Sequence, residues 1–117
     1  MWNVAYTIVA GADLSGQQYK FVNASGVLAT SETNPFGVNQ SKGKPGDHIP
    51  ATKFGYSRLY MGEACSLGDY VGQSNATSGA GTIVTSGGCA FGQVLTGCDS
   101  GGIAHVTCFG APVYLAL

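Results

Sequence analysis

Apolar residues alternate with other residues along the start of the chain. On an extended backbone one face of this segment would carry Trp2, Val4, Tyr6 and Ile8. A period of two is the pattern of a β-strand. We therefore expect residues 1–10 to form an apolar N-terminal strand or arm.

Shorter runs with the same period follow, separated by clusters of Gly, Asn, Ser and Asp that are typical of turns. No run combines the helical period of 3.6 with the length of a helix, and at most one helical turn fits near residues 31–34 or 66–70. The remaining short strands are predicted at 17–22, 27–30, 70–71 and 83–85.

A stretch of the first half returns in the second half at one constant offset. Its matches are Phe36-Gly37 with Phe91-Gly92, Gly46 with Gly101, Thr52 with Thr107, and Phe54-Gly55 with Phe109-Gly110. Each copy predicts a β-hairpin whose strands are entered and left through Phe-Gly, because glycine in a strand marks a bend or a close backbone approach. The hairpin turns would be residues 42–47 and 97–102.

These patterns predict an all-β fold, a small barrel or sandwich of short antiparallel strands built from two repeated halves, with little or no helix. Residues 1–117 form a single domain in this interpretation. It consists of the N-terminal strand or arm (1–10), repeat one (11–62) and repeat two (63–117).

The composition excludes some classes of binding partner. Charged residues make up 9% of the chain, hydrophobic residues 44%, and 19 residues are Gly, which is a folded β-rich composition rather than a disordered one. The net charge is −1 and the longest basic cluster is Lys42-Gly43-Lys44, so we expect no nucleic-acid partner. The N-terminus lacks the basic and apolar runs of a signal peptide or a membrane helix, so no membrane partner is expected either.

Four cysteines leave the redox state open. An even count in a short Gly-rich chain fits one or two disulfides, whereas the missing signal sequence favours buried free thiols. Cys65, Cys89, Cys98 and Cys108 lack the paired Cys-x-x-Cys spacing of zinc sites, so no metal is expected.

The sequence Asp99-Ser100-Gly101-Gly102 invites comparison with a serine protease, because His48 and Asp69 precede it in the matching order. The chain is too short for that fold, and Ser100 falls in a predicted hairpin turn. The other acidic residues are spread singly. We therefore expect no catalytic residues and no cofactor, and interpret the chain as a non-enzyme.

Four stretches carry a resemblance to a known family: residues 8–22, Val27-Leu28-Ala29-Thr30, Pro35-Phe36-Gly37-Val38-Asn39-Gln40, and Lys44-Pro45-Gly46. Together they resemble the small capsid decoration (head cement) proteins of tailed bacteriophages. The resemblance implies a virion protein, made in the host cytoplasm, that binds the outer surface of the capsid and stabilises the head. It also implies the major capsid protein as partner and a homo-oligomer, with a trimer favoured.

Trp2, Val4 and Tyr6 are the predicted capsid- or protomer-binding residues, because an apolar first strand suits strand addition and buried aromatics dominate interfaces. Two alternatives remain. One is a serine hydrolase built on His48, Asp69 and Ser100. The other is a secreted, disulfide-stapled module that binds carbohydrate or another surface, with Trp2, Tyr19, Tyr56 or Tyr60 as its platform.

Overall fold

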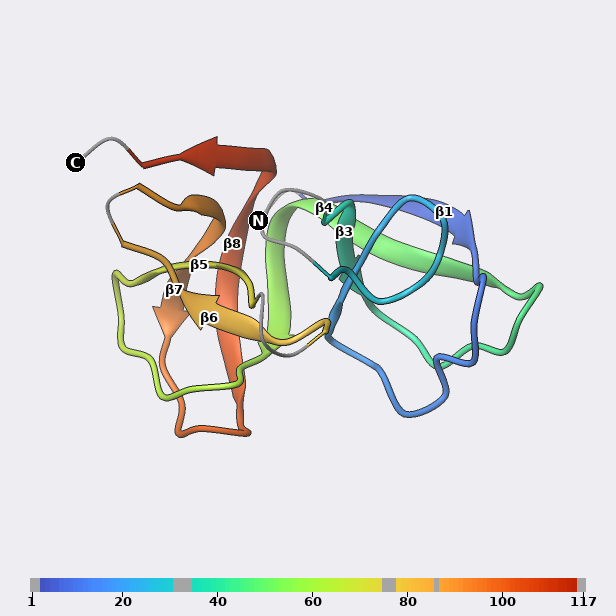
Figure 1. Cartoon of the computed structure of the whole chain (residues 1–117), viewed down its shortest axis with the longest axis horizontal. Coiled ribbons are helices and arrows are strands. Elements are labelled where there is room, and N and C mark those ends of the chain that lie inside the picture. The colour runs from blue at the N-terminus through green and yellow to red at the C-terminus, as the bar shows by residue number, and fades with distance from the viewer. Residues whose placement is uncertain (1–2, 31–34, 75–77, 86, 116–117) are drawn as a thin grey trace.

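A computed structural model describes residues 3–30, 35–74, 78–85 and 87–115 (Figure 1). Within these residues all regular structure is β and no helix is present. The strands are β1 (Val4–Val9), β2 (Phe21–Val22), β3 (Gly37–Asn39), β4 (His48–Tyr60), β5 (Tyr70–Gln73), β6 (Gly81–Ile83), β7 (Cys89–Thr96) and β8 (Ile103–Tyr114).

The named strands pair antiparallel in the order β2-β3-β4-β8-β7-β5-β6, and β1 pairs with β4 outside this path. The two ends of this sheet meet at Gly79, which precedes β6. Its carbonyl accepts a hydrogen bond from Phe21 N in β2 (2.8 Å), and its N–H donates to Ala29 O (3.0 Å). The sheet is therefore nearly closed into a small barrel, which confirms the all-β prediction.

Side chains from both halves fill the barrel. Phe21 of β2 and Phe91 of β7 pack edge to face with ring centroids 5.5 Å apart, and both are fully buried. Edge-to-face packing of this kind adds to the stabilisation that burial itself supplies. A second cluster, under β1 and the first half of β4, consists of Ala10, Leu14, Val22, Ile49 and Ala51.

The long strands β4 and β8 join the two halves. Seven consecutive residue pairs link Phe54–Tyr60 to Ile103–Phe109. The sequence predicted that each of these strands ends at its Phe-Gly pair. Instead the strands continue, and each bends at the glycine, where φ is 97° at Gly55 and 92° at Gly110. Only glycine adopts such an angle at low cost.

The bend in β8 makes room for β1. β8 runs along β4 as far as the Phe54–Phe109 pair, and β1 takes over at the Val4–Phe54 pair. β1 and the first part of β8 thus follow one another along β4, and Figure 1 shows β1 and the end of β8 along the same side of the molecule. The N-terminal arm is a strand within the chain's own sheet.

Other predicted elements are shorter than expected. The strand expected at 17–22 is reduced to Phe21–Val22, because Tyr19 has a left-handed backbone (φ 65°) that interrupts it. In the predicted strand 27–30, Leu28 forms only an isolated bridge with Val22. The possible helical turn at 31–34 lies outside the described residues.

Several equivalent positions of the expected repeat share a local geometry. A Cβ added to Gly37 would lie 2.7 Å from the Thr52 carbonyl oxygen, and one added to Gly92 would lie 2.5 Å from the Thr107 carbonyl oxygen. Both glycines therefore allow the same close approach between neighbouring strands. The duplication itself stays a prediction, which a superposition of the two halves would test.

We predict that Gly37→Ala and Gly92→Ala each lower the free energy of unfolding by about 1–3 kcal/mol, because the added methyl group would be forced against a backbone carbonyl. Gly16→Ala is the control, since a Cβ there would have no atom within 4 Å. Its effect should stay within about 0.5 kcal/mol. Urea unfolding measures all three, and a Gly92→Ala protein as stable as the Gly16→Ala protein would contradict the close approach.

Candidate functional site

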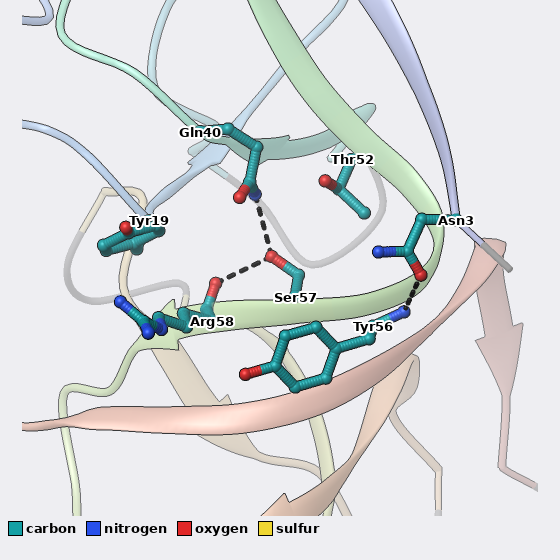
Figure 2. Close-up of a pocket in the computed structure, with 7 residues that line it drawn as sticks. All are labelled: Asn3, Tyr19, Gln40, Thr52, Tyr56, Ser57 and Arg58. Carbon is teal, nitrogen blue, oxygen red and sulfur yellow. Dashed lines mark hydrogen bonds between the residues drawn. The ribbon is translucent and has the colours of Figure 1, made fainter. Parts of the chain in front are cut away.

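A polar pocket of about 300 Å³ opens beside the bend of β4 (Figure 2). The strand supplies residues from both sides of Gly55, and the segments that carry Asn3, Tyr19 and Gln40 complete the walls. The lining residues are Asn3, Tyr19, Gln40, Thr52, Tyr56, Ser57 and Arg58. The pocket thus draws together four parts of the chain that are far apart in sequence.

Gln40 is held in place by a short hydrogen-bond network. Its side-chain amide donates to Ser57 Oγ (2.8 Å) and to Val38 O (3.0 Å). Ser57 Oγ in turn donates to the carbonyl of Arg58 (2.8 Å). Because Ser57 is almost fully buried, these bonds satisfy its hydroxyl and fix the wall between β3 and β4.

Tyr19 enters the pocket from a strained backbone. Among the described non-glycine residues it alone has a positive φ. An aromatic residue in this conformation costs on the order of 1–3 kcal/mol, and such strain clusters at functional sites. Two backbone hydrogen bonds hold it, from Tyr19 N to Asn39 O and from Tyr60 N to Tyr19 O, both 2.7 Å.

Arg58 supplies the positive charge of the site. Its guanidinium carbon lies 5.8 Å from the centre of the Tyr19 ring, within the range of a cation–π contact. Hydrogen bonds raise the pKa of Arg58 above its ordinary value, the one with Tyr56 more than the one with Tyr19. The guanidinium is therefore charged at every pH at which the protein is folded.

Asn3 closes the opposite end of the pocket, as Figure 2 shows. Its Oδ1 accepts a hydrogen bond from Tyr56 N (2.8 Å). The hydroxyl of Tyr56 is hydrogen-bonded to Nδ1 of His105 on β8. The segment before β1, the bend of β4 and the neighbouring strand β8 are thereby linked at one point.

The predicted binding residues lie on or before β1. Trp2 lies outside the described residues. Val4 is half-buried, and Tyr6 is 51% exposed with its ring edge against Phe36, at a centroid distance of 5.9 Å. Their role in binding stays a prediction.

The residues of the hydrolase hypothesis are engaged separately. His48 begins β4, whereas Ser100 Oγ donates to Gly62 O (3.1 Å), beyond the other end of that strand. The carboxylate of Asp69 accepts from Ser66 N (2.9 Å) within its own turn. The three residues therefore do not assemble into a triad, which needs the base beside both partners.

The platform hypothesis named two of the pocket residues. Tyr19 and Tyr56 line the pocket, whereas the ring of Tyr60 is covered by Lys20, whose Nζ lies 4.7 Å from the ring centre. Sequence reasoning did not name the other five lining residues as part of a site: Asn3, Gln40, Thr52, Ser57 and Arg58. The available signal was that Arg58 is the only arginine of the chain and that tyrosines flank it on the same strand.

The cysteines and acids form no metal site in the described part of the chain, where no three His, Cys, Asp or Glu residues gather. Cys65 and Cys98 are the nearest pair, with Sγ atoms 3.9 Å apart on two backbones that hydrogen-bond to each other. Adjacent antiparallel residues in this arrangement are within reach of a disulfide. The alternative of a disulfide-stapled module thus has one suitable cysteine pair.

None of the described residues forms a helix long and apolar enough to cross a bilayer.

A comparison with solved structures finds a protein with a similar fold. The chain is similar to the N base of head fiber gp8.5 from bacteriophage phi29, with a TM-score of 0.68. This chain shares the fold of a phage head-fiber base. The match covers 96% of this chain and 98% of that one, at 14% sequence identity. No protein-family model matches the chain, and no curated protein does.

At this identity the likeness establishes the fold, and pocket residues cannot be transferred from one protein to the other. The similarity extends over both halves, so the phage base and this chain match as whole domains. The chemistry of the pocket must therefore be argued from the residues of this chain.

We predict that Cys108 reacts with a thiol reagent only after unfolding. Burial raises the pKa of Cys108 to about 12, so at pH 8 it carries about three orders of magnitude fewer thiolates than a thiol at the ordinary value of 9.0. Cys89, which is half-buried, should react first. Timed labelling with Ellman's reagent, with and without denaturant, measures this, and equal rates for Cys89 and Cys108 in the folded protein would contradict it.

Proposed function

We propose that this chain is a structural protein of a tailed-phage virion that binds the outer surface of the capsid and stabilises the head. The observation that carries the proposal is the fold shared, over nearly the full length of both chains, with the base of a phage head fiber. The sequence resemblance to capsid decoration proteins, which rests on short motifs in the first half of the chain, supports the same class.

The state of the chemically reactive groups favours a binding role over catalysis. His48, Asp69 and Ser100 are separate, and the thiols of Cys98 and Cys108 have raised pKa values, mainly because of burial. A nucleophilic cysteine needs the opposite shift.

The first strand supplies a suitable contact surface. Among the described strands β1 pairs with β4 alone, so its other edge offers a partner strand a place to add, up to Val9, where the turn at Gly26 lies against the backbone. Tyr6 and Val9 on this strand are each about half exposed, at 51% and 50%. A strand added at this edge would gain main-chain hydrogen bonds and bury these apolar side chains. The partner is the major capsid protein, and copies of the chain associate on the head, a trimer being the expected state.

The head would be reinforced by the large number of copies that bind it. Many copies bind one head, so contacts that are individually modest hold neighbouring capsid subunits together through avidity. A nearly neutral, compact domain suits this task because it adds little charge repulsion between copies.

We predict that the protein co-sediments with purified heads and that Tyr6→Ser lowers its affinity for them about tenfold, the effect of losing one well-buried interface aromatic. Leu67→Ser is the matched control, since Leu67 is 74% exposed but lies in the turn before β5. Its binding should not change. Quantitative sedimentation at several protein concentrations gives both affinities.

The outcomes separate the role from the surface. A wild-type protein that never co-sediments with heads would overturn the proposed function. If the Tyr6→Ser and Leu67→Ser proteins bind heads equally strongly, the proposed function stands but β1 is not the contact surface. Heads that carry the protein should also release their DNA at a higher temperature than bare heads.

A further inference from the structure

The polar pocket beside the bend of β4 has no role in the proposed capsid contact, and its chemistry points to a small ligand. Arg58 is its only cationic group, and no acidic residue lines it. Four of the five described acids hydrogen-bond elsewhere: Asp13 to Ser15 N, Asp47 to Lys44 N, Asp69 to Ser66 N and Glu63 to Thr82 and Ile83. The fifth, Asp99, acts on the neighbouring thiol of Cys98, and no carboxylate is among the groups that shift the pKa of Arg58. Within the described residues no carboxylate therefore balances the charge of Arg58.

The guanidinium is held ready for a partner. Arg58 lies in the middle of the β4–β8 ladder, opposite His105, so its backbone is rigid. Tyr19 covers it from a strained conformation that two hydrogen bonds maintain. A binding group on a rigid element with a fixed neighbour loses little freedom when its ligand arrives.

A carboxylate fits this cation better than a phosphate does. The planar guanidinium fork matches the two oxygens of a carboxylate and forms paired hydrogen bonds with them. Phosphate sites generally combine several cations with backbone N–H groups at a helix N-terminus or a nest. The pocket has a single cation and no helix beside it in the described chain.

The other walls favour a ligand that carries hydroxyl groups. Asn3, Gln40 and Thr52 offer amide and hydroxyl groups, and the rings of Tyr19 and Tyr56 offer flat surfaces, as Figure 2 shows. A pyranose ring has hydroxyls around its edge and C–H groups on its faces, so it can use both kinds of wall. An acidic side chain of a protein would use Arg58 alone and leave these groups without partners.

The size of the pocket limits the ligand to about one sugar residue. Its volume of about 300 Å³ lies at the lower end of the range for ligand sites, about 300–1,000 Å³. We propose that the pocket binds one hexuronate residue of an acidic polysaccharide, with the carboxylate on Arg58 and the sugar hydroxyls on Asn3, Gln40 and Thr52. This inference goes beyond the proposed function and does not depend on it.

The test is an NMR titration of the isotope-labelled full chain with four probes: glucuronate, glucose, acetate and inorganic phosphate. Glucuronate should produce saturable shifts at the pocket residues. Glucose and acetate should each bind at least tenfold more weakly, because each retains only part of the contacts, and phosphate should bind no better than acetate.

Each other outcome overturns the proposal in a defined way. No saturable shift with glucuronate removes the site. If glucose binds as tightly as glucuronate, Arg58 does not contribute to binding. If acetate binds as tightly as glucuronate, the sugar hydroxyls do not contribute. If phosphate binds most tightly of the four probes, the pocket is a general anion site.

Variants locate the binding and separate it from the capsid contact. Arg58→Gln should weaken glucuronate binding at least tenfold, and Arg58→Lys should restore only part of it, since lysine lacks the planar fork. Lys53→Gln controls for net charge, because Lys53 lies over Phe36, outside the pocket. Asn3→Ala, at the exposed end of the site, tests the sugar contact, and because it also removes the hydrogen bond from Tyr56 N, its unfolding curve is compared with that of the wild type.

All four variants should still co-sediment with heads if the two surfaces are independent. Unfolding curves establish that each variant is folded. Glucuronate binding that is equally strong in the Arg58→Gln and Lys53→Gln proteins would refute the assignment of the site.

Discussion

The pairing of β4 with β8 is the constraint on which the rest of this protein depends. Seven consecutive residue pairs bind the two halves into one sheet, and the strands bend at Gly55, within this segment, and at Gly110, directly after it. The bend in β8 leaves the edge of β4 to β1, and the bend in β4 creates the hollow that becomes the pocket. The exposed strand and the polar site are both consequences of the same pairing.

The sequence predicted the fold class because its strands alternate with a period of two and its turns carry Gly, Asn and Asp. It did not predict that β4 and β8 continue through Phe54-Gly55 and Phe109-Gly110. A glycine that changes the direction of a strand and one that ends it give the same local signal, and only the partner strand decides between them. Tyr19 is a similar case, since its positive φ is imposed by hydrogen bonds to Asn39 and Tyr60.

The candidate site was harder to predict than the fold. Asn3, Gln40 and Arg58 have no common spacing, and they meet only because β1 and β3 both adjoin β4. The residues proposed to bind the capsid were predicted from a local property, the apolar alternation of the first strand, which is visible in the sequence alone. Sites assembled by tertiary contacts leave no such periodic trace.

The closure of the barrel at Gly79 has a mechanical consequence. A force that separates the two halves along β4 and β8 loads seven residue pairs together in shear, whereas the seam on the other side is held by the two backbone hydrogen bonds of Gly79, to Phe21 and Ala29, and by the one between Gly62 and Gly81. Under a force that pulls the two halves apart, the seam would therefore open before the central ladder slips. The domain would then open on one side while its two halves remain joined through the β4–β8 ladder.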